Sequence, residues 1–207
     1  MFRGREPWEG TNPVNKKLTA ALSGGAVLVL ALSGCSSDDG NKELDAWAKQ
    51  VCDALPAQDA KVDAANDAIK KAATDNNAPA NVQKTDSQAF QDMSDAYKAL
   101  AQAVQKAGTP PGVEGGEKKQ QDAVTALNGL SASYADLKKQ VDALDTKDQA
   151  KFADGLQGIA TELGKLSKSG NAALKNLEDG DVKYAMAKQD SCKKVAASAS
   201  ARAATTS

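Results

Sequence analysis

The chain contains no histidine, and aromatic residues make up only 4% of it. Without imidazole, general acid-base catalysis would fall to carboxylates, lysine or tyrosine, and a common nitrogen ligand of zinc is missing. The three cysteines include no Cys-X-X-Cys pair, which argues against a thioredoxin-like redox motif. The 26 basic and 27 acidic residues nearly cancel and form no basic block, which argues against nucleic-acid binding.

The residues that are abundant favour helices. Alanine supplies much of the apolar content, and it loses no side-chain rotamer freedom in a helix, while Lys, Gln and Leu lose little. Runs of β-branched residues long enough for strands are missing from the sequence. We therefore predict an all-α protein. Disorder is the alternative for so polar a chain, and the regular apolar spacing described below argues against it.

The first 34 residues have the layout of an export signal. Lys16 and Lys17 precede an apolar run over residues 18–31, and Leu32-Ser33-Gly34-Cys35 follows with small residues at a cleavage site. The run is shorter than the roughly 20 apolar residues of a membrane-spanning helix. We predict cleavage between Gly34 and Cys35. Val14 would make a more typical signal-peptide start than Met1, so a start at Val14 is an alternative.

The tetrapeptide at residues 32–35 resembles the lipobox of bacterial lipoproteins. The resemblance implies that Cys35 carries a diacylglyceryl lipid and becomes the first residue of the mature protein. Two acyl chains hold a protein firmly on a membrane, so the anchor would keep the protein at the outer face of the cell membrane. An ordinary signal peptide or an uncleaved anchor is the alternative. Residues 36–41 are short and polar, so we predict a flexible tether over 35–41.

Lipidation of Cys35 would leave an even pair of cysteines, Cys52 and Cys192, in an exported domain. Thiols are usually oxidised outside the cytoplasm, so we predict a Cys52–Cys192 disulfide. It would close a loop of about 140 residues, for which the chain-entropy model gives at most about 5 kcal/mol of stabilisation. The layout also resembles the small Ala-rich secreted lipoproteins of actinobacteria with one distant Cys pair. That group has no agreed activity.

Apolar residues recur at steps of three and four in four long segments and one short one, which predicts amphipathic helices. The stripes begin with Leu44, Phe90, Leu127 and Phe152, and the last helix spans Val182 to about Val195. We expect a break or bend at Pro56. Short connections favour an up-and-down antiparallel bundle of four long helices and a C-terminal helix over residues 42–195. Residues 196–207 are predicted to be a disordered tail. An intermolecular coiled coil is the alternative.

Possible polar sites are few, and each has a simpler structural interpretation. Asp59, Asp63 and Asp67 follow i, i+4 spacing near three lysines, which is typical of a solvated helix face rather than a metal site. The turn Glu178-Asp179-Gly180-Asp181 is interpreted as a helix cap. Serines without an imidazole partner or a Gly-X-Ser-X-Gly elbow give no evidence of a nucleophile; those considered are Ser131, Ser133 and Ser167.

Five aromatic residues fall on the apolar stripes, where core packing is the first interpretation: Trp47, Phe90, Tyr97, Tyr134 and Phe152. They would line a ligand pocket only if the helices splay apart. We therefore predict a non-enzymatic envelope lipoprotein with a binding or structural role, without cofactor or metal. The membrane is its expected partner, and an envelope protein is another. The alternative function is a carrier or sensor that holds a small, apolar ligand between helices.

Overall fold

The computed structural model describes residues 37–74, 77–177 and 179–205, with side chains described for 42–74, 77–166 and 179–201. Within these ranges the chain forms six α-helices and no strand. The four long helices are α1 (Ser37–Thr74), α2 (Pro79–Ala107), α3 (Gly116–Asp142) and α4 (Gln149–Leu177). Two shorter helices follow, α5 (Asp181–Lys188) and α6 (Asp190–Thr205). The predicted all-α fold is confirmed.

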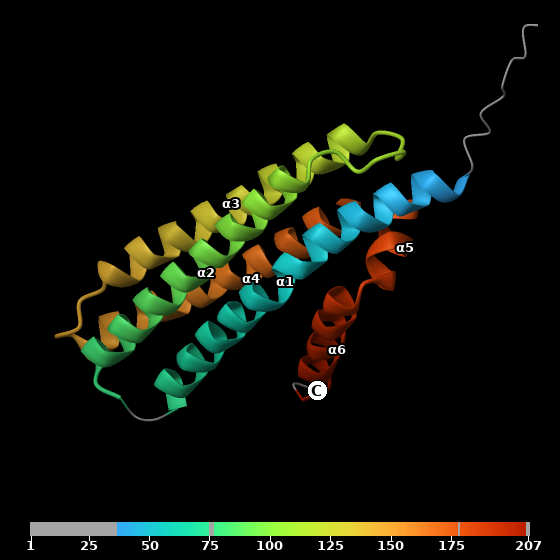
Figure 1. Ribbon diagram of the computed structural model, residues 1–207. Coiled ribbons are helices and arrows are strands. Elements are labelled where there is room, and N and C mark those ends of the chain that lie inside the picture. Colours follow the sequence, from blue (N-terminus) through green and yellow to red (C-terminus); the bar gives the residue numbers. More distant parts are fainter. Residues whose placement is uncertain (1–36, 75–76, 178, 206–207) are drawn as a thin grey trace, which may run out of the picture. The chain divides into compact units, whose positions relative to one another are not determined.

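The long helices pack in chain order, α1 on α2, α2 on α3 and α3 on α4, while α5 and α6 both pack on α1 (Figure 1). This arrangement confirms the predicted helical bundle with an additional C-terminal part. Consecutive long helices are joined by short connections, as an antiparallel bundle requires.

The connection between α2 and α3 begins with a glycine turn that is hydrogen-bonded to α1. Gly108 ends α2 with a φ of 77°, and its N–H bonds to the carbonyls of Val104 and Gln105. The indole nitrogen of Trp47 donates a hydrogen bond to the Gly108 carbonyl at 2.8 Å, which ties this turn to α1. A residue with a side chain at Gly108 would be strained, because positive φ favours glycine.

The helix α1 continues through Pro56 instead of breaking there. Proline in a helix interior removes one backbone hydrogen bond and costs about 3 kcal/mol. Residues on both sides of Pro56 are buried in the core, including Val51 and Ala65, so packing of one continuous stripe offsets that cost.

The C-terminal part differs from the single last helix predicted from Val182 to about Val195. Gln189 has an extended backbone and separates α5 from α6. Its side-chain amide donates to the carbonyls of Asp45 and Ala185 at 3.3 and 3.2 Å. The change of direction allows Val182 to pack in the core while Cys192 reaches α1.

The helices also extend beyond the predicted domain limits of 42–195. The structure begins α1 at Ser37, within the predicted tether, and continues α6 to Thr205, within the predicted tail. Alanine is the best helix former, and it is frequent in residues 196–204, so the local sequence favours a helix here.

Two clusters of buried side chains make up most of the core. The first, named here the disulfide cluster, draws on α1, α2, α3 and α5 and consists of Leu44, Trp47, Ala48, Val51, Cys52, Ala101, Val104, Ala123, Leu127, Val182, Ala185 and Met186. The second, named the distal cluster, draws on α1, α2, α3 and α4 and consists of Ala65, Ala89, Phe90, Met93, Leu137, Val141 and Ile159. The helices α1, α2 and α3 thus contribute side chains to both clusters. The fourth helix is α5 in the disulfide cluster and α4 in the distal cluster.

Candidate functional site

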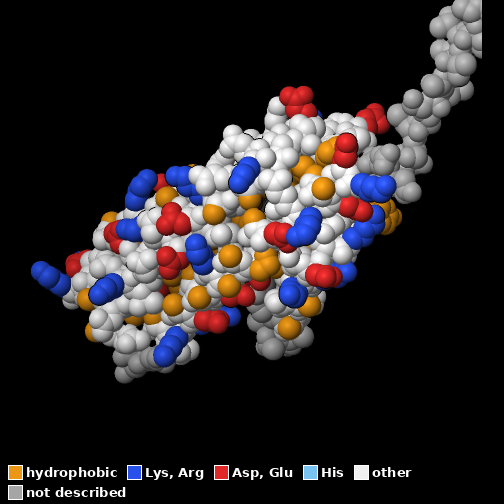
Figure 2. Space-filling model, in the orientation of Figure 1, with side chains coloured by type: hydrophobic (Ala, Val, Ile, Leu, Met, Phe, Trp, Pro, Cys, Tyr) orange, Lys and Arg blue, Asp and Glu red, His pale blue; other side chains and the backbone are white. Residues whose placement is uncertain are grey.

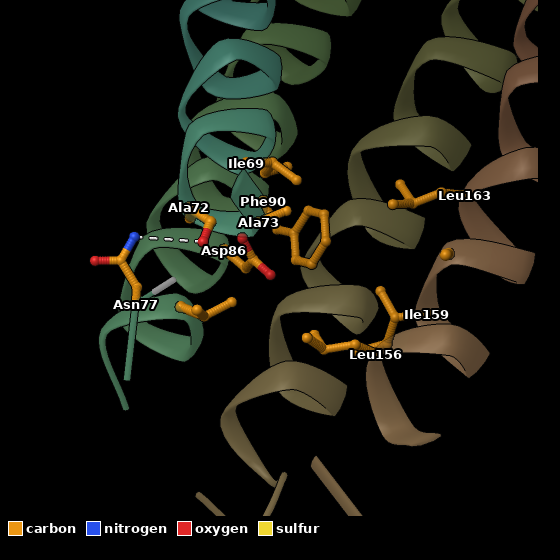
Figure 3. Close-up of a pocket in the computed structure, with 11 residues that line it drawn as sticks. Ile69, Ala72, Ala73, Asn77, Asp86, Phe90, Leu156, Ile159 and Leu163 are labelled. Atoms are coloured by element: carbon orange, nitrogen blue, oxygen red, sulfur yellow. Dashed lines mark hydrogen bonds between the residues drawn. The ribbon is translucent and has the colours of Figure 1, made fainter. Parts of the chain in front are cut away.

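A cavity of about 390 Å³ lies beside the distal cluster, between α1, α2 and α4. Its volume falls within the roughly 300–1,000 Å³ of small-molecule pockets. The largest apolar side chains that line it are Ile69, Val82, Phe90, Leu156, Ile159 and Leu163. Figure 3 shows side chains of α1 and α2 on one side of the opening and Leu156, Ile159 and Leu163 of α4 on the other.

Asp86 is a carboxylate in this otherwise apolar wall. Its side chain is only 5% exposed, and its Oδ1 atom has no hydrogen-bond partner among the described residues. Burial raises the pKa of Asp86 from 3.8 to about 6, because the charged form loses hydration. The carboxyl therefore stays mostly ionised at neutral pH without a counter-charge. This is the most unusual polar group in the described part of the protein.

The local sequence explains why Asp86 points inward. Val82, Asp86, Phe90 and Met93 follow steps of four, four and three along α2, and all four are buried. Asp86 therefore occupies a core position of an amphipathic helix. The stripe predicted from the sequence began at Phe90 and did not include Asp86. The signal that could have found it is an acidic residue one turn before the first aromatic member of the stripe.

One edge of the cavity is closed by a side chain from the α1–α2 connection. The amide nitrogen of Asn77 donates a hydrogen bond to the carbonyl of Ala72 at 3.3 Å, drawn as a dashed line in Figure 3. This bond satisfies one of the free carbonyls at the C-terminal end of α1. It also orients the amide beside the cavity, where Asn77 is a second polar group of the lining.

The five aromatic residues occupy core positions, but they do not form one site. Trp47 belongs to the disulfide cluster, and Phe152 is buried near the start of α4. The rings of Tyr97 and Tyr134 stack with centroids 5.4 Å apart, and Phe90 lies 6.4 Å from Tyr134. Burial raises the pKa of Tyr134 to about 12, so its phenol stays neutral. Only Phe90 of the five is among the described residues that line the cavity.

The serines considered as nucleophiles are not brought together by the fold. The hydroxyl of Ser94 donates to the carbonyl of Ser131 at 2.8 Å, and the two hydroxyls lie 3.2 Å apart in the core between α2 and α3. This buried pair satisfies its own polar atoms, which gives it a packing role. Ser133 lines a shallow depression between α3 and α4. The side chain of Ser167 lies outside the described residues.

The acidic residues singled out in the sequence form local contacts. Asp67 pairs with Lys70 at 3.9 Å on an exposed face of α1, the helix that also carries Asp59 and Asp63. Asp179 accepts a hydrogen bond from the Gly180 backbone at 2.9 Å, and Gly180, with a φ of 59°, precedes α5, which starts at Asp181. Glu178 lies outside the described residues. Within the described ranges, no three His, Cys, Asp or Glu side chains are grouped as metal ligands.

A larger depression of about 840 Å³ lies along α1, α2 and α3, and it is lined by both polar and apolar residues. Lys138 contacts Asp142 at 2.6 Å, and Gln88 donates to Asp92 at 2.9 Å. Acidic and basic side chains also alternate over the face of the molecule visible in Figure 2. Such a mixed surface offers no strong field of one sign to a charged partner.

The predicted Cys52–Cys192 disulfide is present and joins α1 to α6, with Cα atoms 5.1 Å apart. Polar contacts surround it. The hydroxyl of Ser191 donates to Asp53 at 2.8 Å, and Lys188 contacts Asp45 at 3.0 Å. The hydrogen bonds that Asp53 accepts from Lys49 and Ser191 lower its pKa. These contacts hold the C-terminal helices on α1.

The residues predicted for cleavage and lipidation, Gly34 and Cys35, lie outside the described residues. In the part of the chain that is described, none of the helices combines the length and the apolar character needed to cross a bilayer. Comparison with protein-family models, with curated proteins and with solved structures finds no match for this chain.

Proposed function

We propose that this protein is an exported lipoprotein, anchored through a lipid on Cys35 to the outer face of the cell membrane, with a non-enzymatic binding or structural role in the envelope. The observation that carries the proposal is the Cys52–Cys192 bond. Disulfides persist in oxidising compartments and are rare in the cytoplasm, so the bond agrees with the export signal at residues 1–34. The lipobox-like Leu32-Ser33-Gly34-Cys35 supports the anchor.

The anchor is tested by changing Cys35→Ala in the full chain and following the protein in membrane and medium fractions. Without a thiol at this position no diacylglyceryl group can be attached, so we expect release of the protein into the medium. Ser36→Ala is the matched control and should leave the protein on the membrane. Equal membrane retention of Cys35→Ala and the unchanged protein would contradict lipid anchoring through this residue.

The cavity between α1, α2 and α4 favours one binding role, that of a carrier or sensor for a small molecule. A purely structural bundle should be closely packed, because protein interiors normally leave few voids larger than a water molecule. The observed volume of about 390 Å³ would accommodate a ligand with an apolar body.

Native mass spectrometry on protein extracted gently from its own membrane tests the carrier role. We expect two added masses, one covalent on the Cys35 peptide and one non-covalent on the folded protein. A protein that carries the lipid but no other molecule would count against the carrier. The envelope role would then be sought among protein partners by surface crosslinking.

A further inference from the structure

The cavity contains a single ionisable group among its described lining residues. Asp86 comes from α2, while the side chains contributed by α1 and α4 are apolar and Asn77 adds one neutral amide. The nearby charged residues of α2, Lys84 and Asp92, line the polar depression rather than this cavity. Among the described lining residues, Asp86 is therefore the group that could pair with a cation in the cavity.

An unpaired carboxylate in such a place is costly, because a buried charge loses its hydration without compensation. Buried charges in folded proteins are usually paired or bound to metals. The Oδ1 atom of Asp86 has no hydrogen-bond partner, and the side chain is 95% removed from solvent, given its 5% exposure. The surrounding apolar surface would contact the body of a molecule whose polar end reaches the Asp86 carboxyl group, which lines the cavity.

We propose that the cavity binds a small cationic amphiphile, whose protonated amine donates a hydrogen bond to Asp86 while its apolar body lies against Phe90 of α2 and Ile159 of α4. The inference rests on the carrier role proposed above and names its ligand class. Asp86 and the six large apolar side chains of the lining are the recognition elements.

This arrangement makes binding dependent on pH. The amine binds the ionised carboxylate, and in the unliganded protein burial holds the pKa of Asp86 at about 6. Affinity should therefore be nearly constant above pH 7 and fall about tenfold for each pH unit well below 6. The ligand would be released in an acidic medium without unfolding of the bundle.

The experiment uses three probes with the same apolar body: octylamine, octanol and octanoate. The full chain in nanodiscs of zwitterionic lipid is titrated with each probe by calorimetry, and the heat measured with empty nanodiscs is subtracted. Asp86→Asn removes the charge at nearly constant shape. Asp95→Asn, at an exposed carboxylate of the same helix, is its matched control.

We expect octylamine to bind about 10- to 100-fold more tightly than octanol at pH 7.5, the range of a charge-assisted hydrogen bond. Asp86→Asn should abolish this preference and Asp95→Asn should keep it. Ala160→Phe places a ring at an exposed position of the cavity lining. This substitution should weaken the binding of all three probes.

The outcomes separate the two proposals. If octanol binds as tightly as octylamine and Asp86→Asn changes neither, or if octanoate binds best, the cationic ligand is wrong while the carrier role stands. Binding that Ala160→Phe leaves unchanged would place the ligand elsewhere and overturn the inference. If no probe binds, and protein from its own membrane also carries no non-covalent mass, both the ligand class and the carrier role are wrong.

Discussion

The disulfide cluster and the distal cluster share three helices and differ in their fourth. In the disulfide cluster, the short helix α5 inserts Val182 and Met186, and the adjacent α6 is bonded covalently to α1. In the distal cluster, α4 supplies Ile159 and leaves a cavity against α1 and α2. Close packing together with a covalent link suits a stabilising role, and incomplete packing around a buried carboxylate suits a binding role.

The largest effect that separates the two clusters should come from removing the disulfide. Changing both Cys52→Ser and Cys192→Ser frees a loop of 140 residues, which costs about 2–5 kcal/mol of unfolding free energy. Chemical denaturation of the purified double variant and of the oxidised protein measures the difference. Reducing agent should lower the melting temperature of the oxidised protein and leave the double variant unchanged. An unchanged melt on reduction would contradict a stabilising disulfide.

Truncation of one core residue in each cluster should sharpen the comparison. Leu127 in the disulfide cluster is 1% exposed and Ile159 beside the cavity is 4% exposed. Leu127→Ala should cost about 3 kcal/mol, because it opens a new void at a buried position of the disulfide cluster. Ile159→Ala should cost about 2 kcal/mol, since one side of this residue already faces empty space. Denaturant unfolding of both variants measures the costs. Equal costs would indicate that the cavity is filled by neighbouring side chains in solution.

Removal of the buried charge should stabilise the protein. The pKa of Asp86 is about 6 in the folded protein against an ordinary value of 3.8, so between these values the folded state binds more protons than the unfolded state. The free energy of unfolding therefore falls as pH rises through this window and stays lower above it. A shift of this size corresponds to at most about 3 kcal/mol.

Asp86→Asn should consequently raise the unfolding free energy by about 1–3 kcal/mol at pH 7.5 and have little effect at pH 4. Urea denaturation of both proteins across this pH range measures the contrast. Asp95→Asn, at an exposed carboxylate of the same helix, is the matched control. Destabilisation by Asp86→Asn at pH 7.5 would mean that Asp86 has a favourable partner in the folded protein.

The features of the two clusters could not be predicted equally well from the sequence. The helices could be predicted because the spacing of apolar residues is a local signal, and the pairing of Cys52 with Cys192 because only these two cysteines remain if Cys35 is lipidated. The break at Gln189 could not, since it depends on side-chain hydrogen bonds to Asp45 and Ala185. Nor could the helix in the C-terminal tail, where alanine propensity outweighed polar composition.

The cavity was the least predictable feature. Its existence depends on where α4 lies relative to α1 and α2, and the stripe of each helix gives the buried face but not the spacing between helices. The glycines of α4 for which the structure describes the surroundings differ in those surroundings. A side chain at Gly155 would meet Leu144, so this position permits a close approach, whereas Gly158 and Gly164 face open space. Asp86, in contrast, could have been found from the sequence, because it lies one turn before Phe90 on the same stripe, although the predicted stripe did not include it.

The smallest effect is expected at the ion pair between Lys188 of α5 and Asp45 of α1. Their nitrogen and oxygen lie 3.0 Å apart, but the side chains are 57% and 34% exposed, so solvent screens the attraction. Lys188→Ala should cost less than about 1 kcal/mol in the oxidised protein, because the disulfide already holds the C-terminal helices on α1. Hydrogen exchange offers a finer readout. Lys188→Ala should speed amide exchange in α5 more in the protein with a reduced disulfide than in the oxidised protein. Equal acceleration in the oxidised and the reduced protein would show that the ion pair and the disulfide act independently.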